Sequence, residues 1–296
     1  MSTAQLIDGK AIAQAIHQET AARVSALKAR GIVPGLTFVR VGEDPASQSY
    51  VRMKGKKAQE LGITSETIVL PEKTSEAELL ILLGKLNDDP AVHGILVQAP
   101  LPKQISETKI FSTVLPSKDV DGFHPVNVGK LLLGEQGGFK PCTPAGVHEL
   151  LIRSQIPVEG THVVILGRGN IVGKPMAAIL LQKAKNANAT VTLLHSRSRD
   201  IAEHCRRADI LIAAMGQAEF VKADMVKPGA TVIDVGVNRV NDSSDPRGYR
   251  LVGDIDFKAV CEVAAHVTPN PGGVGPMTIA MLMANTATAA EAAAEL

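Results

Sequence analysis

Residues 163–175 read VVILGRGNIVGKP, and this stretch decides the fold. Four apolar residues, three of them β-branched, predict a buried parallel strand over 163–166. Three glycines follow, a helix is expected over 176–185, and a second strand over 190–195 completes a βαβ unit. Such a turn presents backbone N–H groups at the start of a helix, where a phosphate binds. The spacing, GxGxxxG, is one residue longer than the usual dinucleotide fingerprint, so the alternative is a tight turn that binds nothing.

The residues after the second strand indicate which dinucleotide the turn would hold. They read HSRSR over 195–199, and the first acidic residue is Asp200. In this fold an acid at the end of that strand accepts a hydrogen bond from the ribose 2′-OH of NAD, whereas an Arg accommodates the 2′-phosphate of NADP. Arg197, Arg199 and the two serines suit a doubly charged phosphate, and Arg168 of the glycine turn is a further candidate. The pattern favours NADP, and the alternative is a loop of solvated charges.

Composition places the chain among globular proteins of about two domains. Of its 296 residues, 45% are hydrophobic and 21% are charged. A net charge of +1 and an aromatic content of 3%, with no Trp, argue against nucleic-acid and membrane-surface partners. The three cysteines lie far apart in the chain and form no CxxC pair, which favours reduced thiols, a cytoplasmic location and no metal site. We find no apolar run long enough to span a bilayer and no signal peptide.

Apolar periodicity predicts an α/β fold with two domains. Strands are expected in the first half at 35–41, 63–70 and 92–97, alternating with helices at 8–30, 47–61 and 75–86. Further strands are expected near 209–214, 231–235 and 251–253, and the last helix is expected to pack back on the first domain. We therefore predict a three-layer N-terminal domain with a mostly parallel sheet, formed by 1–143 plus 277–296, and a Rossmann-type NADP-binding domain over 144–276.

Side chains suited to acid–base chemistry occur in the first domain. Tyr50 and Lys54 are four residues apart on a predicted helix, so they share one face. A phenol beside an amine suits proton transfer. Gln98 and Asp121 follow the third strand, and ligands of such sheets bind outside the carboxyl ends of the strands. Taken alone, the Tyr–Lys spacing is more typical of an ordinary surface helix.

Seven short motifs, taken together, argue against an ordinary surface helix at this position. They are YxxxKxKK at 50–57, VQxPLP at 97–102, KDVDGF at 118–123, PCTP at 141–144, GRxxxVGxP at 167–175, HSR at 195–197 and PGGVGPMT at 271–278. Each is modest alone, but they occur in one order over nearly the full chain. With these motifs the chain resembles the bifunctional methylenetetrahydrofolate dehydrogenase/methenyltetrahydrofolate cyclohydrolase family, often called FolD.

The resemblance implies a role for each matching residue. Lys54 would be the catalytic residue of the cyclohydrolase step, with Tyr50 beside it, Gln98 holding it and Asp121 binding the pterin ring. The folate-binding residues that it implies are Tyr50, Gln98, Leu101, Asp121, Pro271, Gly272 and Gly273. The cofactor-binding residues that it implies are Gly167, Arg168 and Gly169 at the phosphates, Ser196 and Arg197 at the 2′-phosphate, and Val237 near the nicotinamide. The active site is expected in the cleft between the domains.

The implied activity is NADP-dependent oxidation of 5,10-methylenetetrahydrofolate followed by hydrolysis of the methenyl product to 10-formyltetrahydrofolate. The resemblance also implies that the protein is a homodimer and that it acts in one-carbon metabolism. Two positions depart from the family pattern. Ala99 stands where Leu is usual, which affects folate packing, and Gly169 stands where Ser is common, which removes a hydroxyl from the phosphate site. The alternatives are another two-domain NADP dehydrogenase, such as a shikimate dehydrogenase, or a non-catalytic NADP-binding module.

Overall fold

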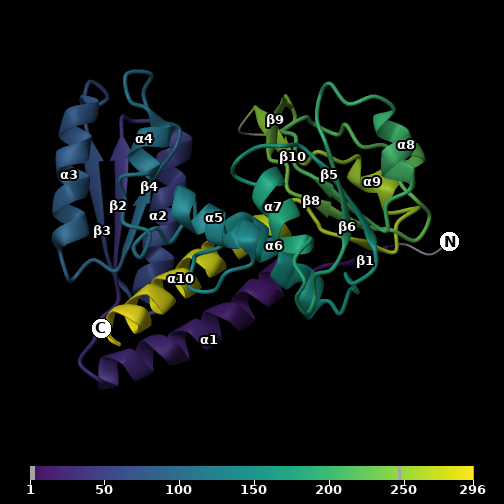
Figure 1. Cartoon of the computed structure of the whole chain (residues 1–296). Helices are drawn as coiled ribbons and strands as arrows, with labels where there is room; N and C mark the ends of the chain where they lie inside the picture. Colours follow the sequence, from purple (N-terminus) through teal and green to yellow (C-terminus); the bar gives the residue numbers. More distant parts are fainter. Residues whose placement is uncertain (1–3, 246–247, 296) are drawn as a thin grey trace. The chain divides into compact units, whose positions relative to one another are not determined.

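The computed structural model describes residues 4–245 and 248–295, which fold as two compact units (Figure 1). One unit, here called the six-stranded unit, consists of residues 143–278 with the described residues up to Ala13. The other, the three-stranded unit, consists of residues 14–142 and the chain from Ile279 onward. Two long helices, α1 (Gly9–Ala29) and α10 (Val274–Ala293), begin in the first of these units and continue into the second.

The six-stranded unit is built on a parallel sheet with the order β1-β11-β8-β7-β5-β6. The strands are β1 (Gln5–Leu6), β5 (His162–Leu166), β6 (Thr190–Leu194), β7 (Ile210–Ala213), β8 (Thr231–Asp234) and β11 (His266–Val267). The chain passes from β5 to β6 on one side and then returns to β7 on the other side of β5. The strand order therefore reverses at β5, and such a reversal opens a crevice at the carboxyl ends of the strands.

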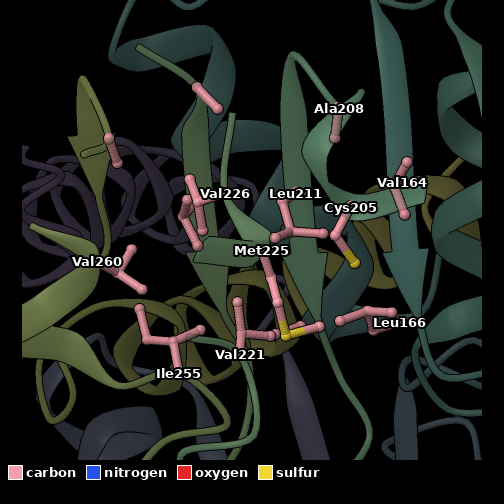
Figure 2. Packing of buried hydrophobic residues seen from close by; sticks show 14 of the residues in the cluster. Val164, Leu166, Cys205, Ala208, Leu211, Val221, Met225, Val226, Ile255 and Val260 are labelled. Carbon is pink, nitrogen blue, oxygen red and sulfur yellow. The ribbon is translucent and has the colours of Figure 1, made fainter. Parts of the chain in front are cut away.

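The central strands of this sheet are buried on both faces. Residues 163–166 of β5 are at most 1% exposed, as are all four residues of β7. Figure 2 shows part of the core, where Leu211 of β7 packs with Val221, Met225 and Cys205 from the segments that cover one face. The helical segments of the unit are α6 (Cys142–Arg153), α7 (Gly173–Leu180), α8 (Ile201–Arg206), η1 (Ala223–Met225) and α9 (Phe257–Val260). Burial on both faces explains why these strands read as continuous apolar runs.

The strand expected near 251–253 is present as β10 (Tyr249–Val252), but it forms an antiparallel hairpin with β9 (Asn238–Asn241) and does not join the parallel sheet. The sheet is instead extended by β11 and β1, which have two residues each and are too short to show a periodic pattern. Through β1 the described residues before Gln14 join this unit, whereas the sequence predicts them in the N-terminal domain. Helix α7 begins at Gly173 and ends at Leu180, earlier at both ends than expected.

The three-stranded unit contains a parallel sheet with the order β3-β2-β4, covered by helices on both faces. The strands are β2 (Gly35–Val41), β3 (Thr64–Leu70) and β4 (Gly94–Val97). The helices are α2 (Pro45–Glu60), α3 (Glu76–Asp88), α4 (Glu107–Phe111), α5 (Pro125–Leu133) and the parts of α1 and α10 beyond the first unit. Every residue of β2 is buried.

Alternation along β2 separates two cores in this unit. Phe38 packs with α1, α2 and α10, and Val39 points to the opposite face, where it packs with α3 and α4. The predicted return of the last helix to this domain is confirmed, since Leu282 and Met283 belong to the Phe38 core. Arg23 of α1 also pairs with Glu291 of α10 at 2.5 Å. The three-layer architecture and the mostly parallel sheets are thus as predicted. None of the helices in the described ranges has the length and apolar character needed to cross a bilayer.

Candidate active site

A cavity of about 510 Å³ lies at the carboxyl ends of β5, β6 and β7, where the strand order reverses. Residues 166–169 line it after β5, His195 and Ser196 after β6, and Met215 and Gln217 after β7. Four of the predicted cofactor-binding residues line this cavity: Gly167, Arg168, Gly169 and Ser196. The position is that of the dinucleotide in a doubly wound sheet.

Two glycines of the β5–α7 turn are required by close packing of the backbone. Gly167 has φ +111°, and a Cβ there would lie 2.1 Å from the carbonyl oxygen of Ala214. A Cβ at Gly173 would lie 1.8 Å from the carbonyl oxygen of Gly167. At Gly169, by contrast, a Cβ would meet no atom of the described residues within 4 Å. Gly169 is therefore free to carry a side chain, while the other two glycines shape the turn.

The start of α7 offers an anion site to this cavity. Within the described part of the chain, no side chain caps the N-terminus of the helix at Val172. A helix N-terminus carries a partial positive charge and N–H groups that point outward. Arg168 is exposed in the turn and adds a full positive charge. Backbone, helix dipole and guanidinium thus favour the same ligand, a phosphate group.

The loop after β6 presents the residues predicted for the 2′-phosphate. The backbone N–H of His195 donates to Ser198 Oγ at 3.0 Å, and that of Arg197 donates to His195 Nδ1 at 3.1 Å, which folds the loop on itself. Ser196 lines the cavity, whereas Arg197 is exposed beside it and lies outside the lining. Val237, which is 55% exposed, also lies outside the lining of this cavity.

The predicted folate residues of the six-stranded unit lie in the loop between β11 and α10. Gly272 has φ +110°, and Gly273 approaches the first turn of α1 so closely that a Cβ on Gly9 would lie 1.9 Å from its carbonyl oxygen. Pro271 is exposed and follows a cis peptide bond at Asn270. The sequence did not reveal that position 9 must be glycine, because the segment that excludes a side chain there lies more than 260 residues away in the chain.

In the three-stranded unit, α2 and β4 bring Lys54 and Gln98 together. The Nζ atom of Lys54 donates to Gln98 Oε1 at 3.1 Å, and Gln98 Nε2 donates to the carbonyl oxygen of Ala99 at 2.7 Å. Asp44 caps α2 by accepting from the N–H of Ser47 at 2.7 Å, which sets the helix that carries Lys54. Lys54 is only 9% exposed, so its amine is largely removed from solvent. Tyr50, one turn earlier, is 45% exposed.

Asp121 belongs to the same group of side chains. Burial, the largest influence, raises the pKa of Asp121, while the positive charge of Lys54 and a hydrogen bond from Cys142 act in the opposite direction. The Cys142 thiol donates to the carbonyl oxygen of Val120 at 3.3 Å, and burial raises its pKa well above the usual value. Cys142 is therefore a neutral thiol at pH 7. An amine, an amide and a carboxyl converge here, which is a set able to move protons.

Two residues that position Asp121 were not found from the sequence. Asn285 of α10 donates through Nδ2 to the carbonyl oxygen of Val120 at 2.8 Å. Asp119 accepts from the backbone N–H groups of residues 122, 123 and 124 and from Asn127, which fixes the turn around Asp121. Asp119 lies within a quoted motif, so a signal was present, whereas Asn285 is a single polar residue in an Ala-rich helix.

A buried carboxyl lies at the end of β8 in the six-stranded unit. Asp234 Oδ1 accepts from the N–H groups of Gly236 at 3.0 Å and Asp254 at 2.8 Å. Its Oδ2 atom has no hydrogen-bond partner among the described residues. Burial, helped by the charge of Asp254, outweighs the N–H bonds and raises the pKa of Asp234 to about 6.

Comparison with known proteins decides the family. The model of the tetrahydrofolate dehydrogenase/cyclohydrolase catalytic domain matches residues 7–121, and that of the corresponding NAD(P)-binding domain matches residues 141–294. The chain belongs to the tetrahydrofolate dehydrogenase/cyclohydrolase family. The resemblance inferred from the seven motifs is thus confirmed.

Relatives in this family are similar over the full length. The bifunctional protein FolD of Dehalococcoides mccartyi is 57% identical, with 99% of both chains covered. The crystal structure of the FolD enzyme from Campylobacter jejuni is 47% identical, with a TM-score of 0.92 and coverage of 97% of this chain and 99% of that one. The Trypanosoma brucei FolD, complexed with NADP cofactor and inhibitor, is 42% identical, with a TM-score of 0.94 and full coverage of both chains. A shikimate dehydrogenase from Aquifex aeolicus, 12% identical with a TM-score of 0.51, shares the fold alone.

The turn glycines lead to a first prediction, on stability. Gly167→Ala forces a Cβ against the Ala214 carbonyl at a φ that disfavours side chains, so we expect the free energy of unfolding to fall by about 2–4 kcal/mol. The matched change Gly169→Ala has open space and should alter it by less than about 0.5 kcal/mol. Urea unfolding of both variants measures the difference, and equal stabilities would contradict the packing argument.

Asp234 leads to a prediction on pH. Its pKa is raised from 3.8 to about 6 in the folded protein, so the folded state holds this proton more tightly than the unfolded chain. The stability that this group contributes is full below pH 4 and is lost as the pH rises through 6, by about 3 kcal/mol for a shift of this size. Asp234→Asn keeps the acceptor at Oδ1 and cannot ionise. We therefore expect the unfolding free energy of the variant, relative to wild type, to increase between pH 4 and pH 7 in urea titrations, and a constant difference would disprove it.

Proposed function

We propose that this chain is a bifunctional one-carbon folate enzyme. It oxidises 5,10-methylenetetrahydrofolate to 5,10-methenyltetrahydrofolate with NADP⁺ and hydrolyses the product to 10-formyltetrahydrofolate. The observation that carries the proposal is the hydrogen bond between the nearly buried Lys54 amine and Gln98, beside Asp121, in a member of this family. A surface lysine would have no reason to be desolvated and held in this way.

The cavity at the β5–α7 turn supports NADP as the cofactor. Gly167 and Gly173 form a backbone cradle that side chains would fill, and the uncapped start of α7 suits a pyrophosphate. Arg168 would join the helix start at the pyrophosphate, and Ser196 in the lining and the exposed Arg197 would hold the 2′-phosphate. Val237 would lie near the nicotinamide. When bound, NADP⁺ would supply the hydride acceptor for the methylene carbon, and the chain's own part would be to orient the folate and exclude water.

Hydrolysis of the methenyl cation would depend on the three-stranded unit. Water adds to the cationic carbon and loses one proton, which leaves a hydroxyl group on that carbon. The bond from the carbon to N5 then breaks as the hydroxyl loses its proton to become the formyl carbonyl, and N5 receives a proton. The formyl group remains on N10, and one proton is released in all. Lys54 would transfer these protons, with Gln98 fixing the amine and Tyr50 beside it. Asp121 would bind the pterin ring, and Leu101, Pro271, Gly272 and Gly273 would complete the folate site.

We extend the proposal to assembly and location. Homodimers are the commonest symmetric oligomers, and we expect one here. All three cysteines are free thiols in the structure, and two of them are buried, which agrees with a cytoplasmic enzyme.

One assay separates this function from its rivals. Methylenetetrahydrofolate and NADP⁺, followed spectrophotometrically, should give NADPH and then loss of the methenyl absorbance, and NAD⁺ should support the reaction less well. A shikimate dehydrogenase-like enzyme would leave methenyltetrahydrofolate intact. A non-catalytic module would bind NADP and show no change with folate.

The role of Lys54 is tested by Lys54→Met, which keeps the length of the side chain and removes the amine. We expect the rate of methenyltetrahydrofolate hydrolysis to fall by about 100-fold or more, because general acid–base catalysis contributes factors of that size. NADP binding, measured by calorimetry, should persist. Lys56→Met on the exposed face of the same helix is the matched control and should hydrolyse normally. Normal hydrolysis by the Lys54 variant would remove the residue from the mechanism.

Cofactor preference is tested at the β6 loop with Arg197→Ala. A hydrogen bond to a charged group contributes about 1.5–3 kcal/mol, so the ratio of NADP to NAD affinity should fall by about ten- to a hundredfold. Arg207→Ala, an exposed position at the end of α8, is the control. Dissociation constants for both nucleotides give the ratio, and an unchanged preference would take Arg197 out of the phosphate site.

A further inference from the structure

A buried carboxylate supports the wall of the nucleotide cavity from behind. Asp254 follows the β9–β10 hairpin and is 0% exposed. Its Oδ2 atom accepts from the backbone N–H groups of Met215 at 2.7 Å and Gly216 at 2.9 Å. Its Oδ1 atom accepts from the N–H of Gln217 at 2.9 Å and from Asn238 Nδ2 at 2.8 Å. One side chain therefore binds three consecutive N–H groups of the segment 215–217, here called the β7 loop.

The β7 loop is part of the cofactor cavity. Met215 and Gln217 line it directly. Ala214 is the residue before the loop. Its carbonyl oxygen lies so close to Gly167 that a Cβ on Gly167 would be only 2.1 Å from it. The loop is thus in contact with the phosphate-binding turn. A displacement of residues 214–217 would change both the wall of the cavity and the backbone contact that positions the turn.

Asp254 occupies a space that the neighbouring backbone leaves for it. A Cβ on Gly236 would lie 2.1 Å from Asp254 Oδ1, so this glycine makes room for the carboxylate. The Asp254 N–H donates to Asp234 Oδ1, which in turn ties the residue to the end of β8. A buried carboxylate is costly unless its oxygens are hydrogen-bonded, and four donors meet that condition here. With its own position fixed by β8, Asp254 can hold a loop in one place.

We propose that Asp254 is a positioning residue for NADP, holding the β7 loop in the conformation that completes the nucleotide cavity before the cofactor binds. A loop ordered in advance removes an entropy cost from binding. The inference rests on the proposed NADP site and adds to it a residue that does not itself line the cavity. It predicts that the affinity for NADP depends on Asp254, although the carboxylate is hidden from the ligand.

The experiment compares Asp254→Asn with Asp256→Asn. In the first variant an amide NH2 faces backbone N–H donors in place of one acceptor oxygen. The second makes the same chemical change two residues away, where Asp256 caps α9 and pairs with Lys222. We expect the dissociation constant and the KM for NADP to rise about tenfold or more in Asp254→Asn, with a smaller change in kcat, and to stay within about twofold in Asp256→Asn.

The outcomes separate this inference from the proposed function. If wild type binds NADP and Asp254→Asn binds it equally well, the positioning role is wrong. If wild type itself does not bind NADP, the proposed function fails instead. A loss of thermal stability without a change in KM would indicate a structural role only and would also overturn the inference.

A second measurement needs no variant and decides the case if Asp254→Asn does not fold. Hydrogen exchange of the wild-type protein without nucleotide should show the amides of Met215, Gly216 and Gln217 exchanging at least about 100-fold more slowly than a free peptide, because each donates to a buried acceptor. Exchange close to the free-peptide rate would show that the loop is not held before NADP binds, and the inference would fail.

Discussion

The proposed cofactor site depends on the contact of two backbones at the carboxyl ends of β5 and β7. The carbonyl of Ala214 lies so close to Gly167 that only a residue without a side chain fits, and Gly167 in turn closes against Gly173 at the start of α7. Strand order sets this contact, because β7 lies beside β5 and not beside β6. The glycine turn proposed to bind phosphate, the start of α7 and the cavity all follow from it. Asp254 maintains the same contact from the interior by holding the residues after Ala214.

In the three-stranded unit the corresponding constraint is electrostatic. Lys54 is taken out of solvent by the packing of α2 on β2, and its amine finds an amide oxygen from the end of β4 and the charge of Asp121. Burial disfavours the charged form of the Asp121 carboxyl, whereas the positive charge of Lys54 favours it. Cys142 and Asn285 both donate to the carbonyl oxygen of Val120 and so fix the backbone next to Asp121. A polar site inside an apolar fold is stable only because each of these groups has partners.

Much of the fold was predictable because its strands and helices carry strong local signals. The strand expected at 163–166, the helix expected at 75–86 and the strand expected at 35–41 appear in the structure as β5, α3 and β2. The errors fall where a strand is too short to have a period. β1 and β11 have two residues each and form only by pairing with their neighbours. In the hairpin of β9 and β10, the apolar residues Leu251 and Val252 resemble part of a core strand.

The sequence by itself determined the two α/β domains, the glycine turn after β5, the basic loop after β6, and the family. These depend on residue types at short spacings along the chain. Only the tertiary structure decided which residues act together. It paired Lys54 with Gln98 across 44 positions and set Asp254 behind a loop 37 to 39 residues earlier. It also required glycine at position 9 because of a carbonyl at 273. The physical reason is that hydrogen bonds and steric exclusion act over a few ångströms in space, and separation along the chain carries no information about such distances.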